Sequence, residues 1–354
     1  MTVQAIFDDL RVRFSDLVPE FELREQAEQV LEIRRLKQER SAVILAHNYM
    51  DPVLFHAVAD IRGDSLELSR KAAEADAEVI VYCGVRFMAE TAKILNPGTT
   101  VLLPSKVGGC SLASGITPEQ VRELKRMFPG APVVTYINTY ADVKAETDIC
   151  CTSSNAAAVV ESLGSDLVIC IPDAYLAANI ARETGRKIVY PELGVLPEGE
   201  PGVDYGMVGW NALCEVHEQF TVEDIANVRK QIPDAIILAH PECSPEVVQA
   251  SDYSSSTSAM TRFVEESKGG RYLLLTECAM GDNIAAANPD KDMIRMCSVR
   301  CPHMNEVKLQ EVIDALRYNQ HVIEVPEDLR VKAKRSIDRM LAIGPKKTPT
   351  VPGD

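Results

Sequence analysis

The sequence predicts an α/β protein built from three similar three-layer αβα domains, each with a short parallel sheet. After residue 40, short apolar runs alternate with helix-like segments, which is typical of parallel strands joined by crossover helices. This alternation occurs three times, and each time the first apolar run ends in polar residues two positions apart. The length of 354 residues also exceeds what one hydrophobic core usually supports.

The expected domain order follows from this repeat. Residues 1–40 are charged and have apolar positions spaced for one buried face, so we expect a helical extension. Three α/β domains should follow over residues 41–115, 116–216 and 217–307. We expect the C-terminal segment 308–354 to pack on the first of them. Each repeat is long enough to be a domain in its own right, which argues against a solenoid.

The first strand of each repeat ends in a pair of polar side chains. The three runs are VILAHNY, PVVTYIN and IILAHPE, and their terminal pairs are His47 and Tyr49, Tyr136 and Asn138, and His240 and Glu242. Residues two apart on a strand point to the same face, so each pair should act at one place.

A hydroxyl-rich helix start follows each of these strands. The segments are GDSLELSRKAA, CTSSNAAAVVESL and SSSTSAMTRFVEE, and the hydroxyls at or near their N-caps are Ser65, Ser153, Ser256 and Thr257. A second strand comes next in each repeat (EVIVYCG, DLVICIP, RYLLLTE). After a further helix we expect a third strand (TVLLP, KIVYP, DMIRM), and shortly beyond it a cysteine: Cys110, Cys214 and Cys301.

All these polar residues fall at the same end of their predicted sheets. Ligands of open parallel sheets bind beyond the carboxyl ends of the strands. If the three domains face one another, these ends enclose a single central active site.

The cysteines divide into two groups. There are ten, and without a readable secretion signal a disulfide framework is not expected, so metal binding or catalysis is favoured. Seven are interpreted as structural: Cys83 and Cys170 inside apolar strands, and, on weaker grounds, Cys150, Cys151, Cys243, Cys278 and Cys297. The three at repeat-equivalent places, Cys110, Cys214 and Cys301, are predicted metal ligands.

The kind of metal stays open at this point. Thiolates favour zinc or an iron–sulfur centre over magnesium or calcium. Structural zinc usually closes its shell with four protein ligands, whereas three cysteines leave one corner free for Lewis-acid chemistry.

Charge and hydropathy exclude several functions. The net charge of −15 argues against a broad nucleic-acid surface. No apolar run is long enough for a membrane span, and no secretory signal is readable, so we expect a cytoplasmic protein. An anionic ligand would need local donors such as helix N-termini to hold it against the overall field.

The chain resembles the quinolinate synthase family over residues 40–310. The motifs that carry the resemblance are AHNYMDP (46–52), GDSLELS (63–69), CGVRFMAETAKILNP (83–97), GGCSLA (108–113), VVTYINT (133–139), TSSNA (152–156), CEVHE (214–218), AHPEC (239–243), SSST (254–257) and CPHM (301–304). That family has three α/β domains around a pseudo-threefold axis, in agreement with the repeat.

The resemblance implies a reaction, a cofactor and partners. The family condenses iminoaspartate with dihydroxyacetone phosphate to quinolinate, losing phosphate and water, in NAD biosynthesis. By resemblance, Cys110, Cys214 and Cys301 hold a [4Fe–4S] cluster with one open iron. An aspartate oxidase or dehydrogenase would supply iminoaspartate. Neither nucleic acid nor membrane is implied.

The same resemblance suggests roles for the strand-end residues. Tyr49 and Glu242 are the favoured acid–base pair, and His240 can join them. The substrate-binding residues would be His47, Ser65, Tyr136, Asn138, Ser153, Ser256 and Thr257. His217 would orient a neighbouring group or contact substrate.

Three segments depart from the family pattern or extend it. Ala212 stands where the family usually has glycine, between Trp210 and Cys214. The stretch 194–210 is interpreted as a long surface loop, and the Pro-rich tail 346–354 as disordered. Two other functions remain to be weighed: an aconitase-type hydro-lyase, and a zinc-stabilised module that binds small anions.

Overall fold

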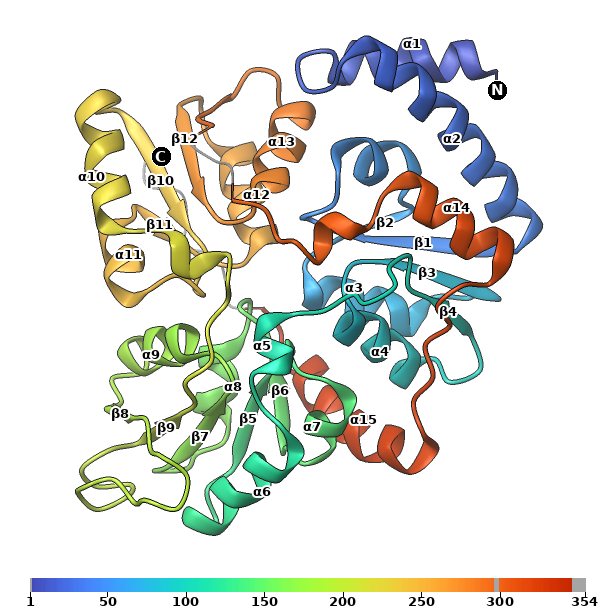
Figure 1. Ribbon diagram of the computed structural model, residues 1–354. Helices are drawn as coiled ribbons and strands as arrows, with labels where there is room; N and C mark the ends of the chain where they lie inside the picture. Colours follow the sequence, from blue (N-terminus) through green and yellow to red (C-terminus); the bar gives the residue numbers. More distant parts are fainter. Residues whose placement is uncertain (1, 296–298, 346–354) are drawn as a thin grey trace. The chain divides into compact units, whose positions relative to one another are not determined.

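The computed structural model describes residues 2–295 and 299–345. Helices and strands alternate along it as the apolar runs predict (Figure 1). The strands are β1 (Ala42–His47), β2 (Ile61–Gly63), β3 (Val79–Cys83), β4 (Thr100–Leu102), β5 (Val133–Tyr136), β6 (Ile149–Cys151), β7 (Val168–Ile171), β8 (Ile188–Val189), β9 (Met207–Gly209), β10 (Ala235–Ala239), β11 (Tyr253–Ser254), β12 (Arg271–Leu275) and β13 (Asp292–Met293).

The helices connect these strands in order. They are α1 (Val3–Phe14), α2 (Glu20–Glu39), η1 (Leu54–Val58), α3 (Ser65–Glu74), α4 (Arg86–Leu95), α5 (Ser111–Ser114), α6 (Pro118–Met127), α7 (Ala141–Ala145), α8 (Ala156–Ser162), α9 (Ala174–Glu183), η2 (His217–Gln219), α10 (Val222–Gln231), α11 (Pro245–Ala250), α12 (Thr257–Glu266), α13 (Cys278–Ala287), η3 (Met304–Glu306), α14 (Leu309–Tyr318) and α15 (Glu327–Leu341). Several begin at side-chain caps, including capping boxes at Thr117 and Thr221.

The strands form three parallel sheets, which confirms the predicted fold class. Their orders are β2-β1-β3-β4, β6-β5-β7-β9-β8 and β11-β10-β12-β13. In every sheet the first strand of the repeat (β1, β5 or β10) lies between the short strand that follows it in the chain (β2, β6 or β11) and the next strand (β3, β7 or β12), so the repeat seen in the sequence is a repeat of topology. The arrangement of the three domains about a common axis, and their exact borders, stay predictions.

The second sheet differs from the expected strand order. The segment KIVYP was predicted as the third strand of its repeat, but β8 lies at the edge and β9 pairs with β7 in its place. Strand β9 is only three residues long and lies next to glycines, so it leaves no apolar run to detect. The strands β2, β6 and β11, which are also only two or three residues long, were likewise not predicted.

By its internal contacts the chain divides into two compact units. The first comprises Met1–Gly108, Val264–Leu273 and Glu277–Glu324, and the second comprises Gly109–Phe263, Leu274–Thr276 and Val325–Asp354.

In the first unit, the N-terminal extension is helical as predicted. Helix α1 buries Ile6, Phe7, Leu10 and Phe14 on one face, which is the spacing expected of an amphipathic helix. Helices α1 and α2 contact each other, and α14 packs along α2 (Figure 1). The C-terminal segment is split, because α15 contacts α7 and β6 of the second unit.

The second unit has the layers expected of a doubly covered sheet. Alternate residues of its strands, including Val133, Ile169 and Val208, pack with Val121 and Leu124 of α6. The intervening residues point to the opposite face because side chains alternate along a strand. Their positions are buried as well, as Val134 shows. The long continuous apolar strands are thus explained by burial on both faces.

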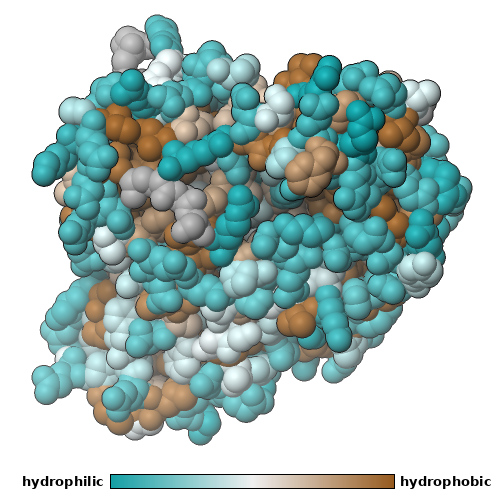
Figure 2. Space-filling view, turned by 45° about the horizontal axis from the view of Figure 1, so that its top comes forward, coloured by the Kyte–Doolittle hydropathy of each residue, from teal (hydrophilic) through white to brown (hydrophobic). Residues whose placement is uncertain are grey.

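The surface is largely polar where Figure 2 shows it, with hydrophobic residues in separate patches. Among the described residues, no helix has the length and apolar character that crossing a membrane requires.

Candidate active site

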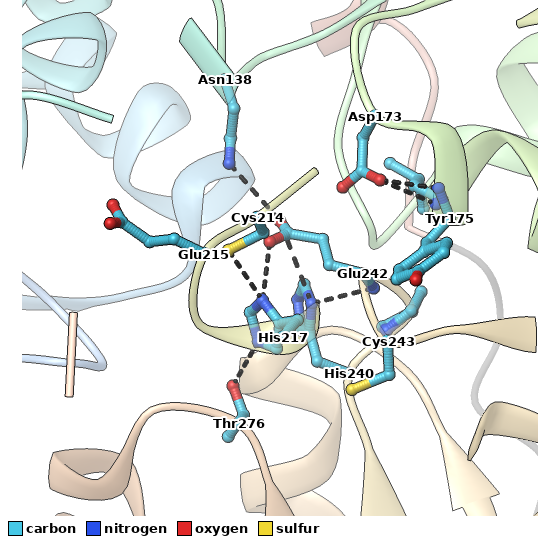
Figure 3. A network of polar contacts seen from close by, with 12 residues as sticks. Asn138, Asp173, Tyr175, Cys214, Glu215, His217, His240, Glu242, Cys243 and Thr276 are labelled. Atoms are coloured by element: carbon cyan, nitrogen blue, oxygen red, sulfur yellow. Dashed lines mark hydrogen bonds and ion pairs between the residues drawn. The ribbon is translucent and has the colours of Figure 1, made fainter. Parts of the chain in front are cut away.

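Glu242, three residues beyond the end of β10, is the centre of a buried polar network in the second unit (Figure 3). Its side chain is 4% exposed. Its Oε1 accepts hydrogen bonds from the Tyr136 hydroxyl at 2.5 Å and from Asn138 Nδ2 at 3.4 Å. Its Oε2 lies 2.8 Å from Nδ1 of His217. Three side chains predicted separately from the sequence therefore converge on one carboxylate.

The surroundings of Glu242 favour its ionised form. Burial raises its pKa, but His217, His240 and the hydrogen bond from Tyr136 together lower the pKa well below its ordinary value. An ionised carboxylate can only accept hydrogen bonds, so Nδ1 of His217 carries the proton between them. The other ring nitrogen of His217 lies 2.9 Å from the Thr276 hydroxyl, which fixes the ring plane.

His240 stacks on His217, with ring centroids 4.6 Å apart. Its Nδ1 accepts the backbone N–H of Glu242 at 3.3 Å. A neutral imidazole carries one proton, so in His240 it resides on Nε2. His240 can therefore offer an N–H to an anion, or a proton to a reacting atom.

Asp173 is a second buried carboxyl group, which the sequence analysis missed. Its Oδ1 caps α9 by accepting the N–H groups of Tyr175 and Leu176 (Figure 3). Its Oδ2 is buried and has no hydrogen-bond partner among the described residues. Burial, and then the charge of Glu242, raise the pKa of Asp173 well above its ordinary value. An Asp directly before an apolar helical run is the signal that would have identified it as a cap.

Cys110 and Cys214 lie in neighbouring segments of the second unit. The hydroxyl of Ser111 donates to the Leu213 carbonyl at 3.1 Å and accepts the N–H of Glu215 at 3.2 Å. It thereby links the residue after Cys110 to both neighbours of Cys214. Burial, with the nearby Glu242 and Cys110, raises the pKa of the Cys214 thiol well above its ordinary value.

The three predicted ligand cysteines share one local structure. Each begins a helical turn: the N–H groups of Ser114, Glu218 and Asn305 donate to the carbonyls of Cys110, Cys214 and Cys301, each at 3.0 Å. All three are partly exposed, whereas Cys83, Cys150, Cys151, Cys170 and Cys243 are buried. Cys278 is disulfide-bonded, and Cys297 lies outside the described residues, as does the tail 346–354.

This donor set fits a thiophilic metal centre. Two thiols lie in neighbouring segments of one unit, and a third with the same local structure lies in the other. The Cys214 sulfur is 3.1 Å from Nδ1 of His217, so His217 can orient the thiol and Glu242 together. Cys214, His217 and Glu242 also offer ligand atoms within 4.8 Å of one another, close enough to hold a single ion. That the three cysteines share one cluster stays a prediction.

Ala212, which stands where the family usually has glycine, fits here because it packs against another glycine, Gly115. A Cβ added to Gly115 would lie 2.6 Å from the Cβ of Ala212, so the absence of a side chain at Gly115 makes room for the Ala212 methyl. The indole N–H of Trp210 donates to the Gly115 carbonyl at 2.8 Å. The segment before Cys214 is therefore held against the turn that follows Cys110.

In the first unit, His47 and Tyr49 form a second strand-end pair. Nδ1 of His47 accepts the backbone N–H of Tyr49 at 3.3 Å, and the two rings meet edge to face at 4.6 Å. Ser65 is the first residue of α3, whose cap is Asp64. The predicted helix-start position of Ser65 is confirmed.

The remaining predicted hydroxyls lie in the second unit. Ser256 accepts the N–H of Ala259 at 3.4 Å and so caps α12, whose first residue is Thr257. Ser153 lies in the turn before α8, where Asn155 is the N-cap. The structure thus gathers Tyr136, Asn138, His217, His240 and Glu242 into one network, and His47 and Tyr49 into another.

Fold and site together define a parallel α/β protein with a buried carboxylate–imidazole cluster next to the segments that carry the Cys110 and Cys214 thiols. The chain belongs to the family described as Quinolinate synthetase A protein, whose model matches residues 31–342.

The curated relatives agree with this assignment. The chain is 48% identical to quinolinate synthase 2 of Mesorhizobium japonicum over 342 residues, covering 97% of this chain and 99% of the relative. It is 48% identical to quinolinate synthase of Agrobacterium fabrum over 94% of this chain and 90% of the relative. It is 50% identical to quinolinate synthase of Xylella fastidiosa over 88% of this chain and 86% of the relative.

Proposed function

We propose that this chain is a quinolinate synthase that condenses iminoaspartate with dihydroxyacetone phosphate, with loss of phosphate and water. The observation that carries the proposal is the 48% identity to a quinolinate synthase over 99% of that relative's length. The network around Glu242 supports it, because ring formation requires several proton transfers at close range.

Cys110, Cys214 and Cys301 would hold a [4Fe–4S] cluster through three thiolates. When bound, such a cluster supplies an open iron that acts as a Lewis acid toward oxygen. An aspartate oxidase or dehydrogenase would supply the iminoaspartate, because that imine hydrolyses in water.

The chain's own residues would bind and protonate the substrates. In His47 and His240, Nδ1 accepts a backbone N–H, so both neutral rings carry their proton on Nε2 and can donate to anionic oxygens. The hydroxyls of Ser65, Ser153, Ser256 and Thr257 lie at or near helix starts, where N–H groups and the helix dipole favour anions. These donors would hold carboxylates and phosphate despite the net charge of −15.

Glu242 and Tyr49 would move protons. The lowered pKa of Glu242 favours a carboxylate that could accept a proton from substrate, and a proton on Nδ1 of His217 would stabilise its charge. Tyr136 and Asn138 donate hydrogen bonds to Glu242 in this structure. With substrate bound, one of these donors would hydrogen-bond the substrate instead. Tyr49 would provide a hydroxyl that donates or accepts a proton.

The proposal is tested by assaying the anaerobically reconstituted protein for quinolinate formed from the two substrates. Cys110→Ala, Cys214→Ala and Cys301→Ala should each lose the bound iron, its visible absorption and the activity. Cys83→Ala and Cys170→Ala are the matched controls and should keep the iron. Full iron content and activity in any one of the first three variants would contradict the ligand assignment.

A zinc-bearing anion-binding module is the second candidate. The proximity of donor atoms from Cys214, His217 and Glu242 favours it, since one ion could bind there. Metal analysis after anaerobic purification separates the two: about four irons with sulfide per chain support the cluster, and one zinc in a colourless protein supports the module.

A further inference from the structure

Two strand-end loops, each within its own unit, have the same backbone structure. In His47–Met50 and His240–Cys243, the histidine Nδ1 accepts the N–H two residues later, at 3.3 Å in both loops. The N–H three residues later donates to the histidine carbonyl, at 3.0 Å from Met50 and 2.9 Å from Cys243. The third residue of each loop is a proposed acid–base group, Tyr49 or Glu242.

A buried asparagine from a neighbouring helix holds each loop. Asn283 of α13 donates through Nδ2 to the carbonyls of Asn48 at 3.0 Å and Met50 at 2.8 Å. Asn179 of α9 donates in the same way to the carbonyls of Pro241 at 2.9 Å and Cys243 at 3.0 Å. The amide thus bonds the residue on either side of Tyr49 in one unit and of Glu242 in the other.

The two asparagines are equivalent in sequence and in environment. Each is the sixth residue of its helix, in CAMGDN and AYLAAN. Their exposed fractions are 4% for Asn283 and 7% for Asn179. In both, Oδ1 is buried and has no hydrogen-bond partner among the described residues. A buried acceptor without a partner lowers the stability of the fold. Both side chains therefore hydrogen-bond the loop carbonyls through Nδ2 while leaving Oδ1 in an unfavourable environment.

The strand-end loop that follows β5 and carries Tyr136 does without this device. The sixth residue of α4, the equivalent helix position, is Thr91, whose hydroxyl donates to the Phe87 carbonyl of the same helix. The loop that carries Tyr136 is held from within the second unit instead: Thr139 donates to the Tyr136 carbonyl, and buried Lys144 donates to the Thr139 carbonyl. The fold therefore does not require an asparagine at this helix position.

We propose that Asn179 and Asn283 are positioning residues that hold Glu242 and Tyr49 in their working orientations. The inference rests on the proposed function only for the roles of Glu242 and Tyr49. The physical reason is that the two carbonyls flanking a residue fix the peptide planes on either side of it, and hence the direction of its side chain. Small misplacements of an acid–base group reduce the rate strongly.

The test replaces each amide by an apolar side chain of similar size, in Asn179→Leu and Asn283→Leu. Asn96→Leu is the matched control, because Asn96 Nδ2 also donates to two carbonyls, Ala72 at 2.6 Å and Ala92 at 3.2 Å, away from the strand-end loops. We expect kcat to fall about 100-fold in the first two variants, with a smaller change in KM, while the control keeps its kcat.

A second readout does not depend on activity. Backbone hydrogen exchange should accelerate at the Cys243 amide in Asn179→Leu and at the Met50 amide in Asn283→Leu, each in its own loop only. Alkylation of the Cys243 thiol, which is buried in the native protein, should accelerate in Asn179→Leu but not in Asn283→Leu. If a leucine variant does not fold, the corresponding Asn→Asp variant replaces it, because a carboxylate has the same shape but no N–H to donate.

The outcomes separate the two proposals. If the positioning variants keep kcat while losing as much thermal stability as Asn96→Leu, the asparagines are only structural and the inference is wrong. Unchanged exchange in both loops also overturns it. If the wild-type protein forms no quinolinate, the proposed function fails, and loop exchange and thiol alkylation still decide whether the asparagines hold the loops.

Discussion

The loops that carry Glu242 and Tyr49 have the same backbone structure, but they differ in what surrounds the third residue of the loop. Glu242 is buried and accepts hydrogen bonds from Tyr136, Asn138 and His217. Tyr49 is only partly buried, and its ring lies edge-on to His47. The repeat therefore supplies the same backbone support twice, while the side chain at its tip and the donors around that side chain decide the chemistry. One loop carries a fixed negative charge and the other a phenol.

Glu242→Gln tests the charged loop and should have the largest effect. The amide keeps the size of the side chain but cannot carry charge or take up a proton, and its NH₂ group would face one of the present donors. We expect the rate of quinolinate formation to fall at least about 100-fold. Glu246→Gln on the exposed face of α11 is the control and should remain active. A Glu242→Gln enzyme with near wild-type kcat would remove Glu242 from the chemistry.

Tyr49→Phe tests the phenol loop and should have a smaller effect. It removes one hydroxyl and leaves the ring, the loop and the edge contact with His47 in place. We expect about a tenfold loss of kcat, at the modest end of single acid–base contributions. Tyr318→Phe, at an exposed position, should show no loss. A greater loss than in Glu242→Gln would reverse the comparison.

Tyr136→Phe removes one of the three hydrogen-bond donors to Glu242 and so tests how these donors affect its pKa. Loss of the 2.5 Å hydrogen bond should raise the pKa of Glu242, since that bond is among the causes that lower it. The acid limb of the rate–pH profile should therefore move to higher pH. An unmoved acid limb would mean that the profile reports a group other than Glu242.

His56 lies near the Tyr49 loop, and His56→Gln should change how the free energy of unfolding depends on pH. Nε2 of His56 lies 3.1 Å from the Asn283 carbonyl. Burial, with Arg13 and Arg62, lowers the pKa of His56 from 6.5 to about 4, although that hydrogen bond opposes the shift. The unfolded chain therefore takes up a proton near pH 6.5 and the folded chain does not, so stability present above pH 6.5 is lost as the pH falls toward 4.

We expect the wild-type unfolding temperature to fall over this range more than that of His56→Gln, as measured by thermal scans at stepped pH. His321→Asn, at an exposed position, should follow the wild type. Parallel curves for wild type and His56→Gln would show that His56 does not contribute.

Local sequence patterns were enough to predict the three repeats, the strand-end polar pairs and the division of the cysteines into predicted ligands and structural residues. Each depends on local periodicity: alternating side chains, apolar strand runs and hydroxyls at helix starts are readable within about ten residues. Only the tertiary structure decided which strand pairs with β7 and which side chains surround Glu242. Tyr136 and Glu242 are 106 residues apart in the chain, and no local pattern encodes their contact.

Asn179 and Asn283 have positions that the sequence reveals but contacts that only the folded structure reveals. Their equivalent helix positions are visible in the sequence, but an asparagine within a helix is ordinarily a solvent-facing or weakly helix-forming residue. Its role appears only when the helix packs beside a loop 62 to 235 residues away in sequence and brings two carbonyls within reach of one amide. Hydrogen bonds of that kind depend on how packed elements meet, which periodicity does not specify.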